Sequence, residues 1–175
     1  MVELTTAIHY VFEAPIDKVV FDISHQTYIH KMLTGRAQAF IDPKHYTDVN
    51  GFSNPAESSY DLFPLGHTYT ALSLACGLAK ARDVLQQKHR IVTVIGDGSL
   101  SGGQAFEALN NIAEQGGNII VIINDNAMSI AENHGGYYQN LEKLRLSNGT
   151  ENNNIFRALG LDYTYEPNGN DVHAL

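Results

Sequence analysis

The sequence predicts an α/β fold with three layers, in which a mostly parallel sheet is flanked by helices. Two runs of apolar and β-branched residues, 91–95 and 119–123, are too short for free-standing helices and indicate buried strands. The residues between them can form a helix through about residue 115, which makes a strand–helix–strand unit. Because such crossovers are right-handed, both strands end at the same, carboxyl edge of the sheet, where open α/β folds bind ligands.

Composition sets the limits on function. The 175 residues have the length of one domain, and 43% are hydrophobic, which is enough for a sizeable core. A net charge of −8 argues against a nucleic-acid-binding surface. The single cysteine, Cys76, excludes an internal disulfide. The sequence contains no signal peptide and no apolar run of membrane-spanning length, so we expect a cytoplasmic protein without a membrane partner.

In the first half of the chain, helical spacing of apolar residues predicts a helix over 2–13, and a short strand follows over 19–21. The loop 22–26 then lies on the ligand side of a parallel sheet. Residues 41–66 lack periodicity and hold three prolines, and a loop of this length is usually functional or mobile. A helix rich in small residues is predicted from residue 66 to about residue 87.

In the second half, a helix is predicted over 137–146 and a polar turn over 147–154. A short helix over 155–159 and a strand over 161–165 follow. The last predicted element is a helix that begins near residue 169.

Two polar turns follow the two long strands: Gly96-Asp97-Gly98 and Asn124-Asp125-Asn126. A carboxylate and a carboxamide offered together are hard oxygen ligands that suit Mg²⁺, which completes its shell with phosphates and water. Gly98 has no Cβ to obstruct a diphosphate, and a helix capped by Ser99 or Ser101 directs its positive end toward one. Each turn alone is common, but the pair, one crossover apart, indicates a Mg²⁺–diphosphate site.

The stretch from Gly96 to Asn126 resembles the thiamine diphosphate motif, which opens with GDG and closes with NDN. More narrowly, the chain is similar to 1-deoxy-D-xylulose-5-phosphate synthases in GDGSLSGGQAFEALNNIAE, NDNAMSIAEN, VELTTAIHYVF, DISHQTYIHKMLTGR and GHTYTALSLACGLAKARD. The resemblance covers nearly the whole chain. It implies the diphosphate-binding domain of the thiamine diphosphate-binding fold, with residues 1–175 as a single domain truncated at both ends relative to the family.

The resemblance also implies an activity. Such enzymes are transferases that use thiamine diphosphate and Mg²⁺ to condense pyruvate with glyceraldehyde 3-phosphate, with loss of CO₂, in isoprenoid precursor and thiamine biosynthesis. The family places a glutamate that acts on the cofactor in a second domain, which no segment here resembles. We therefore expect the isolated chain to be inactive and to need the missing domain or a second copy, as a homodimer.

Site residues follow from the same resemblance. It implies metal contacts from Asp97, Asn126 and the backbone carbonyl of Met128. It implies cofactor contacts from Gly66, Gly96, Asp97, Gly98, Ser99, Asn126, His25 and His67.

The resemblance implies that His25 and His67 are catalytic. DISHQ matches the family's DVGHQ, although a histidine in such a loop is by itself more often structural. Ser24 replaces the usual glycine and would be strained at a positive φ. His67 in GHTYTALS matches the histidine of GHSSTSIS, and a capping role at the helix start is the alternative; Tyr69 stands where the family has a serine.

Three alternatives stay open. HKMLTGR, residues 30–36, resembles the family's HKILTGR but can also be a solvated basic turn. The whole chain can be the amino-terminal subunit of a split transketolase. It can also be a non-catalytic domain that binds metal-diphosphate weakly or serves only in assembly.

Overall fold

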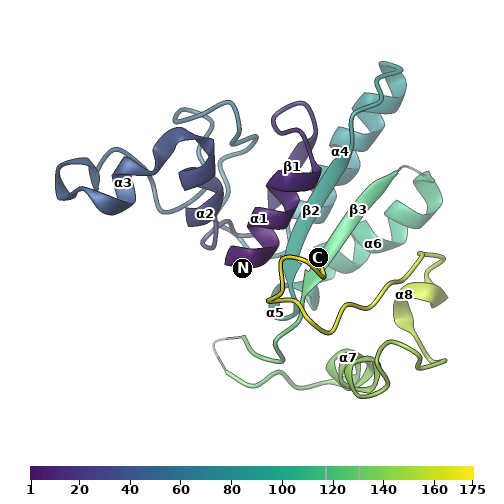
Figure 1. Cartoon of the computed structure of the whole chain (residues 1–175). Helices are drawn as coiled ribbons and strands as arrows, with labels where there is room; N and C mark the ends of the chain where they lie inside the picture. The colour runs from purple at the N-terminus through teal and green to yellow at the C-terminus, as the bar shows by residue number, and fades with distance from the viewer. Residues whose placement is uncertain (117, 130) are drawn as a thin grey trace.

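The structure is a computed structural model that describes residues 1–116, 118–129 and 131–175. Its centre is a parallel sheet of three strands in the order β1-β2-β3 (Figure 1). The strands are β1 (Lys18–Phe21), β2 (Ile91–Gly96) and β3 (Ile119–Asn124). Ile91 is the register partner of Lys18 in β1 and of Ile119 in β3, so the strands start level and end at one edge. The predicted fold class is confirmed.

The described helices surround this sheet. They are α1 (Val2–Val11), α2 (Tyr28–Lys31), the π-helical turn η1 (Met32–Arg36), α3 (Gln38–Ile41), the 3₁₀ turn η2 (Pro43–His45), α4 (Ala71–Val84), α5 (Asp97–Leu100), α6 (Gly103–Gln115), α7 (Gly136–Leu146) and α8 (Ile155–Ala158). None of them is both long and apolar enough to cross a lipid bilayer.

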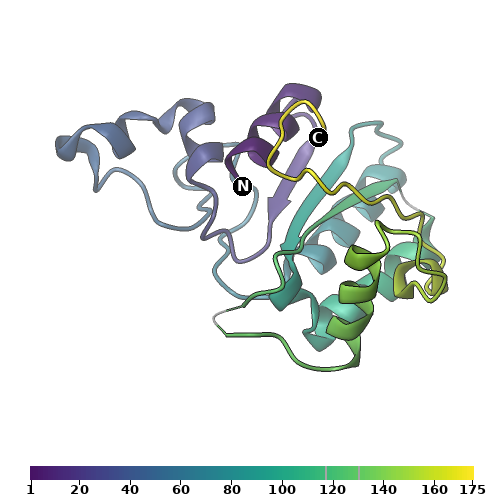
Figure 2. The same cartoon turned by 60° about the horizontal axis from the view of Figure 1, so that its bottom comes forward.

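The core lies on both faces of the sheet, which gives the three layers (Figures 1 and 2). On one face, Ile8 of α1 packs with Val94. On the other face, Leu72 of α4 and Leu109 of α6 pack with Ile95. Neighbouring strand residues point to opposite faces. The central strand is therefore buried on both sides, as its apolar run predicted.

Helix α4 begins at Ala71, whereas the sequence predicted a helix from residue 66. Tyr69 has a positive φ of 58°, which stops the helix from extending further back. The carboxylate of Asp22 accepts hydrogen bonds from the backbone N–H groups of residues 69–71, at 2.9 or 3.0 Å. This buried carboxylate caps the helix and decides where it starts.

Residues 161–175 form neither the predicted strand nor the predicted final helix. The ring of Tyr163 stacks on that of Phe156 in α8, with centroids 5.5 Å apart and planes at 3°. Arg157 lies over the same tyrosine ring. These contacts draw the segment to α8 and leave a cavity of about 1050 Å³ between it and β3. The segment therefore packs on α8 through its side chains and does not form backbone hydrogen bonds with β3 as a further strand.

Candidate functional site

The first polar turn lies at the carboxyl end of β2, where Asp97 opens the short helix α5. Its side chain is almost completely buried. Gly96 is the register partner of Asn124, which places Asp97 beside Asp125. Burial raises the pKa of Asp97, and the charge of Asp125 raises it further, against the opposing effect of two backbone N–H groups. A bound cation would stabilise the ionised form of such a carboxylate.

The second polar turn folds the chain back at the end of β3. The side-chain Oδ1 of Asn126 accepts a hydrogen bond from the backbone N–H of Met128 at 3.0 Å, and Ala127 between them has a φ of 63°. The backbone N–H of Asn126 lies close enough to the Asp97 carboxylate to oppose the rise of its pKa. The structure thus brings Asp97 and Asn126 together. That they bind a metal, with the carbonyl of Met128, stays a prediction.

The oxygens at this edge fit Mg²⁺ by their chemistry. They are a carboxylate, a carboxamide and backbone carbonyls, which are hard ligands. Among the described residues, no group of three His, Cys, Asp or Glu side chains could hold a metal ion. A cation here would therefore need further oxygens, which a diphosphate and water can supply.

Gly98 lies directly under the loop that follows β3. A Cβ at this position would overlap the side chain of Ser129. The sequence predicted that Gly98, without a Cβ, does not obstruct a diphosphate, and this stays a prediction; in this structure the side chain of Ser129 lies over the glycine. A diphosphate that approaches Gly98 would have to displace this side chain, so cofactor contacts from Gly96 and Gly98 stay predictions.

Neither Ser99 nor Ser101 caps α6, contrary to the sequence prediction, because the N-cap is Gly102. The hydroxyl of Ser99 donates to Asp22 and accepts from the N–H of Tyr69. Asp22 thus joins the end of β1 to both α4 and α5. No sequence motif assigns a role to Asp22. Its position, directly after β1 as Asp97 directly follows β2, was the signal that could have found it.

The two predicted catalytic histidines are both exposed. His25 follows Ser24 in the loop after β1. His67 and the neighbouring Gly66 precede α4 rather than open it, and the His67 Nδ1 lies 3.1 Å from the carbonyl oxygen of Thr68. The alternative of a capping role for His67 is wrong, because Asp22 already binds the N–H groups at the start of α4. A role for either histidine at the reacting carbon stays a prediction.

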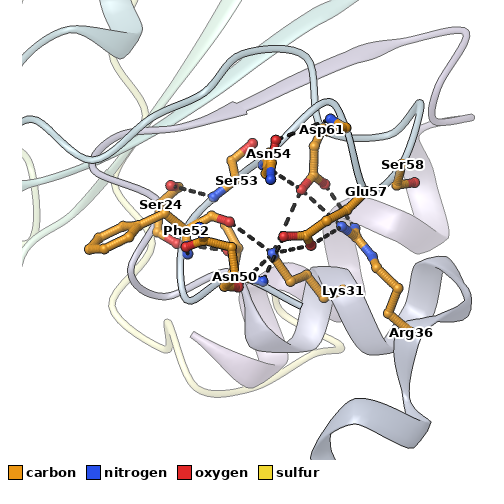
Figure 3. A network of polar contacts seen from close by, with 12 residues as sticks. Ser24, Lys31, Arg36, Asn50, Phe52, Ser53, Asn54, Glu57, Ser58 and Asp61 are labelled. Atoms are coloured by element: carbon orange, nitrogen blue, oxygen red, sulfur yellow. Dashed lines mark hydrogen bonds and ion pairs between the residues drawn. The ribbon is translucent and has the colours of Figure 1, made fainter. Parts of the chain in front are cut away.

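Lys31 and Arg36 belong to a buried charge cluster with Glu57 and Asp61 (Figure 3). Lys31 is 0% exposed, and its Nζ donates to Glu57 at 2.6 Å and to the carbonyls of Asn50 and Phe52 at 2.7 and 2.8 Å. The alternative of a solvated basic turn is therefore wrong. The cluster folds the long, irregular loop of residues 50–61 against α2.

Ser24 ties the histidine loop to this region. Its φ of 71° confirms that a non-glycine residue is strained here, at about 1–2 kcal/mol. Its Oγ accepts a hydrogen bond from the backbone N–H of Ser53 at 2.8 Å (Figure 3). This hydrogen bond offsets about 1 kcal/mol of the strain. The loop that carries His25 is thus anchored to the segment that Lys31 holds.

His9 extends the buried charge cluster to α1. Its Nε2 lies 2.8 Å from Nδ1 of His30, and Nε2 of His30 lies 3.2 Å from Asp61. Burial, followed by the proximity of His30, lowers the pKa of His9 from 6.5 to about 4. The unfolded chain therefore takes up a proton near pH 6.5 that the folded chain does not take up until about pH 4.

The contribution of His9 to stability is consequently present above pH 6.5 and lost as the pH falls toward 4. We expect the free energy of unfolding, from urea titrations, to decrease over this range. His9→Gln should flatten the decrease, whereas His173→Ala, at an exposed position, should not. An unchanged pH slope in His9→Gln would contradict this account.

Helix α7, predicted over 137–146 and observed at Gly136–Leu146, braces both loops. The hydroxyl of Tyr138 donates to Oγ of Ser101 at 2.7 Å. Arg145 forms an ion pair with Asp125 at 2.5 Å. Neither contact was predictable from the sequence, because no local pattern links residues of this helix to the segments after β2 and β3.

Comparison with known proteins agrees with the motifs. The profile of the family described as 1-deoxy-D-xylulose-5-phosphate synthase matches residues 1–158. The 1-deoxy-D-xylulose-5-phosphate synthase of Brevibacillus brevis is 49% identical over 152 residues, 87% of this chain and 24% of that protein. Its counterpart in Listeria monocytogenes is 43% identical over 178 residues, 98% of this chain and 29% of that protein. The chain thus spans about a quarter of the length of these relatives.

Among solved structures, the chain is similar to a Mycobacterium smegmatis protein described as thiamin diphosphate-dependent. The TM-score is 0.46 and the identity 18%, over 76% of this chain and 22% of that one. A score this low carries no weight in the assignment. The profile match, which includes the histidine loop and both polar turns, is decisive. The chain belongs to the 1-deoxy-D-xylulose-5-phosphate synthase family.

Proposed function

We propose that this chain is the first domain of a 1-deoxy-D-xylulose-5-phosphate synthase and supplies the Mg²⁺–diphosphate half of its thiamine diphosphate site. The observation that carries the proposal is the buried Asp97 beside Asp125 and Asn126 at the carboxyl edge of the sheet, in a chain of this family. The whole enzyme would condense pyruvate with glyceraldehyde 3-phosphate with loss of CO₂. Thiamine diphosphate, when bound, supplies the carbanion chemistry of that reaction.

The residues of this chain would bind the metal and the diphosphate and orient the cofactor. Asp97, Asn126 and the carbonyl of Met128 would hold the metal, whose charge lets an acidic domain accept a diphosphate. His25 and His67, both exposed, would move protons at the reacting carbon. These metal and diphosphate contacts involve only the diphosphate end of thiamine diphosphate. We therefore expect the chain alone to have no synthase activity.

The first test is cofactor binding. We expect calorimetry to show that thiamine diphosphate binds this protein only in the presence of Mg²⁺. Asp97→Ala should abolish the binding, because it removes the carboxylate of the donor set. Glu107→Ala, at an exposed site on α6, is the control. If Asp97→Ala binds thiamine diphosphate as tightly as the unsubstituted protein, the proposed site is wrong.

We further propose that the chain forms a dimer in the cytoplasm. Half a site requires a second domain or a second copy, and a C₂ dimer is the commonest closed arrangement. Within one chain, the small residues Ala75 and Ala79 of α4 are fully buried against Ile91, so these two side chains cannot face a partner.

Light scattering during size-exclusion chromatography tests the dimer. At micromolar concentration we expect a species of twice the 19.2 kDa chain mass. A single species of 19.2 kDa throughout that range would contradict the dimer. A third outcome, in which the chain dimerises but yields no turnover when the rest of a synthase is supplied, would favour a domain used only in assembly.

A further inference from the structure

Asn133 contacts the carboxylate at the centre of the proposed metal site. Its Nδ2 donates a hydrogen bond to Oδ2 of Asp97 at 2.9 Å. Its Oδ1 accepts a hydrogen bond from the hydroxyl of Ser129 at 2.5 Å. An ionised carboxylate can only accept, and a hydroxyl can donate, so this pair of contacts determines which end of the amide faces Asp97.

The loop that carries Asn133 is held in place from two sides. Ser129 lies over Gly98, where a Cβ would collide with it. The backbone N–H of Ser129 also donates to the carbonyl of Ala131 at 3.0 Å, next to a bridge between Met128 and Glu132. The turn after β3 therefore closes over α5 and brings Asn133 to Asp97 across 36 residues of sequence.

We propose that Asn133 is a positioning residue for cation binding. Through its bond to Oδ2 it restrains the plane in which the Asp97 carboxylate can face a divalent cation. The inference rests on the proposed function, since it takes Asp97 to be the ligand. Groups that orient a metal ligand from behind typically contribute 10–100-fold to metal affinity.

If Asn133 had a purely structural role, its replacement would lower stability; if it positions Asp97, the replacement lowers the affinity for the cation. The side chain of Asn133 is only partly buried, so its replacement removes little core packing. Stability should therefore change little, while the affinity for the cation falls. Affinity and stability, measured on the same variants, separate the two roles.

The experiment uses Mn²⁺ alone as a paramagnetic probe of an oxygen-ligand site. Free Mn²⁺ is measured by electron paramagnetic resonance during titration of the protein, and NMR line broadening locates the bound ion. Asn133→Ala should weaken Mn²⁺ binding by about 10–100-fold, and Ser129→Ala, which removes the donor to Asn133, should weaken it less. His134→Ala, the exposed neighbour in the same loop, should bind as the unsubstituted protein does.

A second measurement needs no metal. The side-chain amide protons of Asn133 should shift in the NMR spectrum when Asp97 is replaced by alanine, because they lose their acceptor. Signals that do not respond overturn the inference. Unchanged Mn²⁺ affinity in Asn133→Ala also overturns it; if that variant does not fold, Ser129→Ala decides in the same way.

Failure of the proposed function gives a different result. If Mn²⁺ broadens no resonance around Asp97 in the unsubstituted protein, the metal site fails and the positioning role fails with it. The amide shift still reports the bond between Asn133 and Asp97 in that case. If Mn²⁺ binds at Asp97 equally well with and without Asn133, only the positioning role is wrong.

Discussion

Replacement of Lys31 by methionine is expected to lower the free energy of unfolding by about 3–5 kcal/mol, the usual cost of breaking a buried ion pair from one side. Lys31 has no exposed surface, and its Nζ donates three hydrogen bonds, to Glu57 and to two backbone carbonyls. Methionine has a similar volume but no donor, so the carbonyls of Asn50 and Phe52 lose this hydrogen bond and Glu57 loses the shorter of its two ion pairs. Urea denaturation followed by circular dichroism measures the change.

The matched control is Lys44→Met, at an exposed position in η2, which should cost less than about 0.5 kcal/mol. Equal effects of the two substitutions would mean that the buried charge cluster does not hold the loop of residues 50–61. We also expect Lys31→Met to increase hydrogen exchange in that loop.

Acid should weaken the same cluster. Burial alone would raise the pKa of Asp61, but hydrogen bonds from Arg36 and His30 outweigh it and place the pKa well below the ordinary 3.8. A carboxyl whose pKa is lower in the folded chain contributes stability above its unfolded pKa and loses it as the pH falls. The cluster is therefore fully stabilising at neutral pH, where the Lys31 comparison is made.

Substitution of either predicted catalytic histidine is expected to have the largest effect on rate. When this chain is joined to the rest of a synthase, His25→Ala and His67→Ala should each lower kcat/KM by about 10²–10⁴-fold, the usual span for a proton-transfer group. Both side chains are exposed, so folding should be nearly unaffected. Steady-state kinetics and thermal unfolding of the same variants provide the two readouts.

His45→Ala is the control, because His45 lies in η2 and pairs with Asp48 at the surface. It should leave kcat/KM unchanged. A near-normal rate combined with a lower Tm in His25→Ala or His67→Ala would identify that histidine as structural instead. The two variants can also give different results, which would identify one histidine as catalytic and the other as structural.

The sequence by itself determined the sheet, its parallel order and the edge where the site lies. Runs such as 91–95 and 119–123 are local patterns that predict strands. The burial of β2 on both faces follows from its apolar composition, whereas β3, at the edge of the sheet, is only half-buried. Parallel pairing of β2 and β3 then brought Asp97 next to the turn after β3 without any side-chain detail. The family was equally determined, because its motifs are contiguous stretches of sequence.

Only the tertiary structure decided which polar groups meet. Asp22 sets the start of α4 from 49 residues away, and Lys31 becomes a buried anchor because Glu57 folds over it. Ser129 covers Gly98, and Asn133 reaches Asp97, through the closure of one loop. Such contacts follow no period of 2 or 3.6 residues. They form where separate elements bring unpaired donors and acceptors together out of water, and leaving those groups unpaired would cost more than ordering the loops that join them.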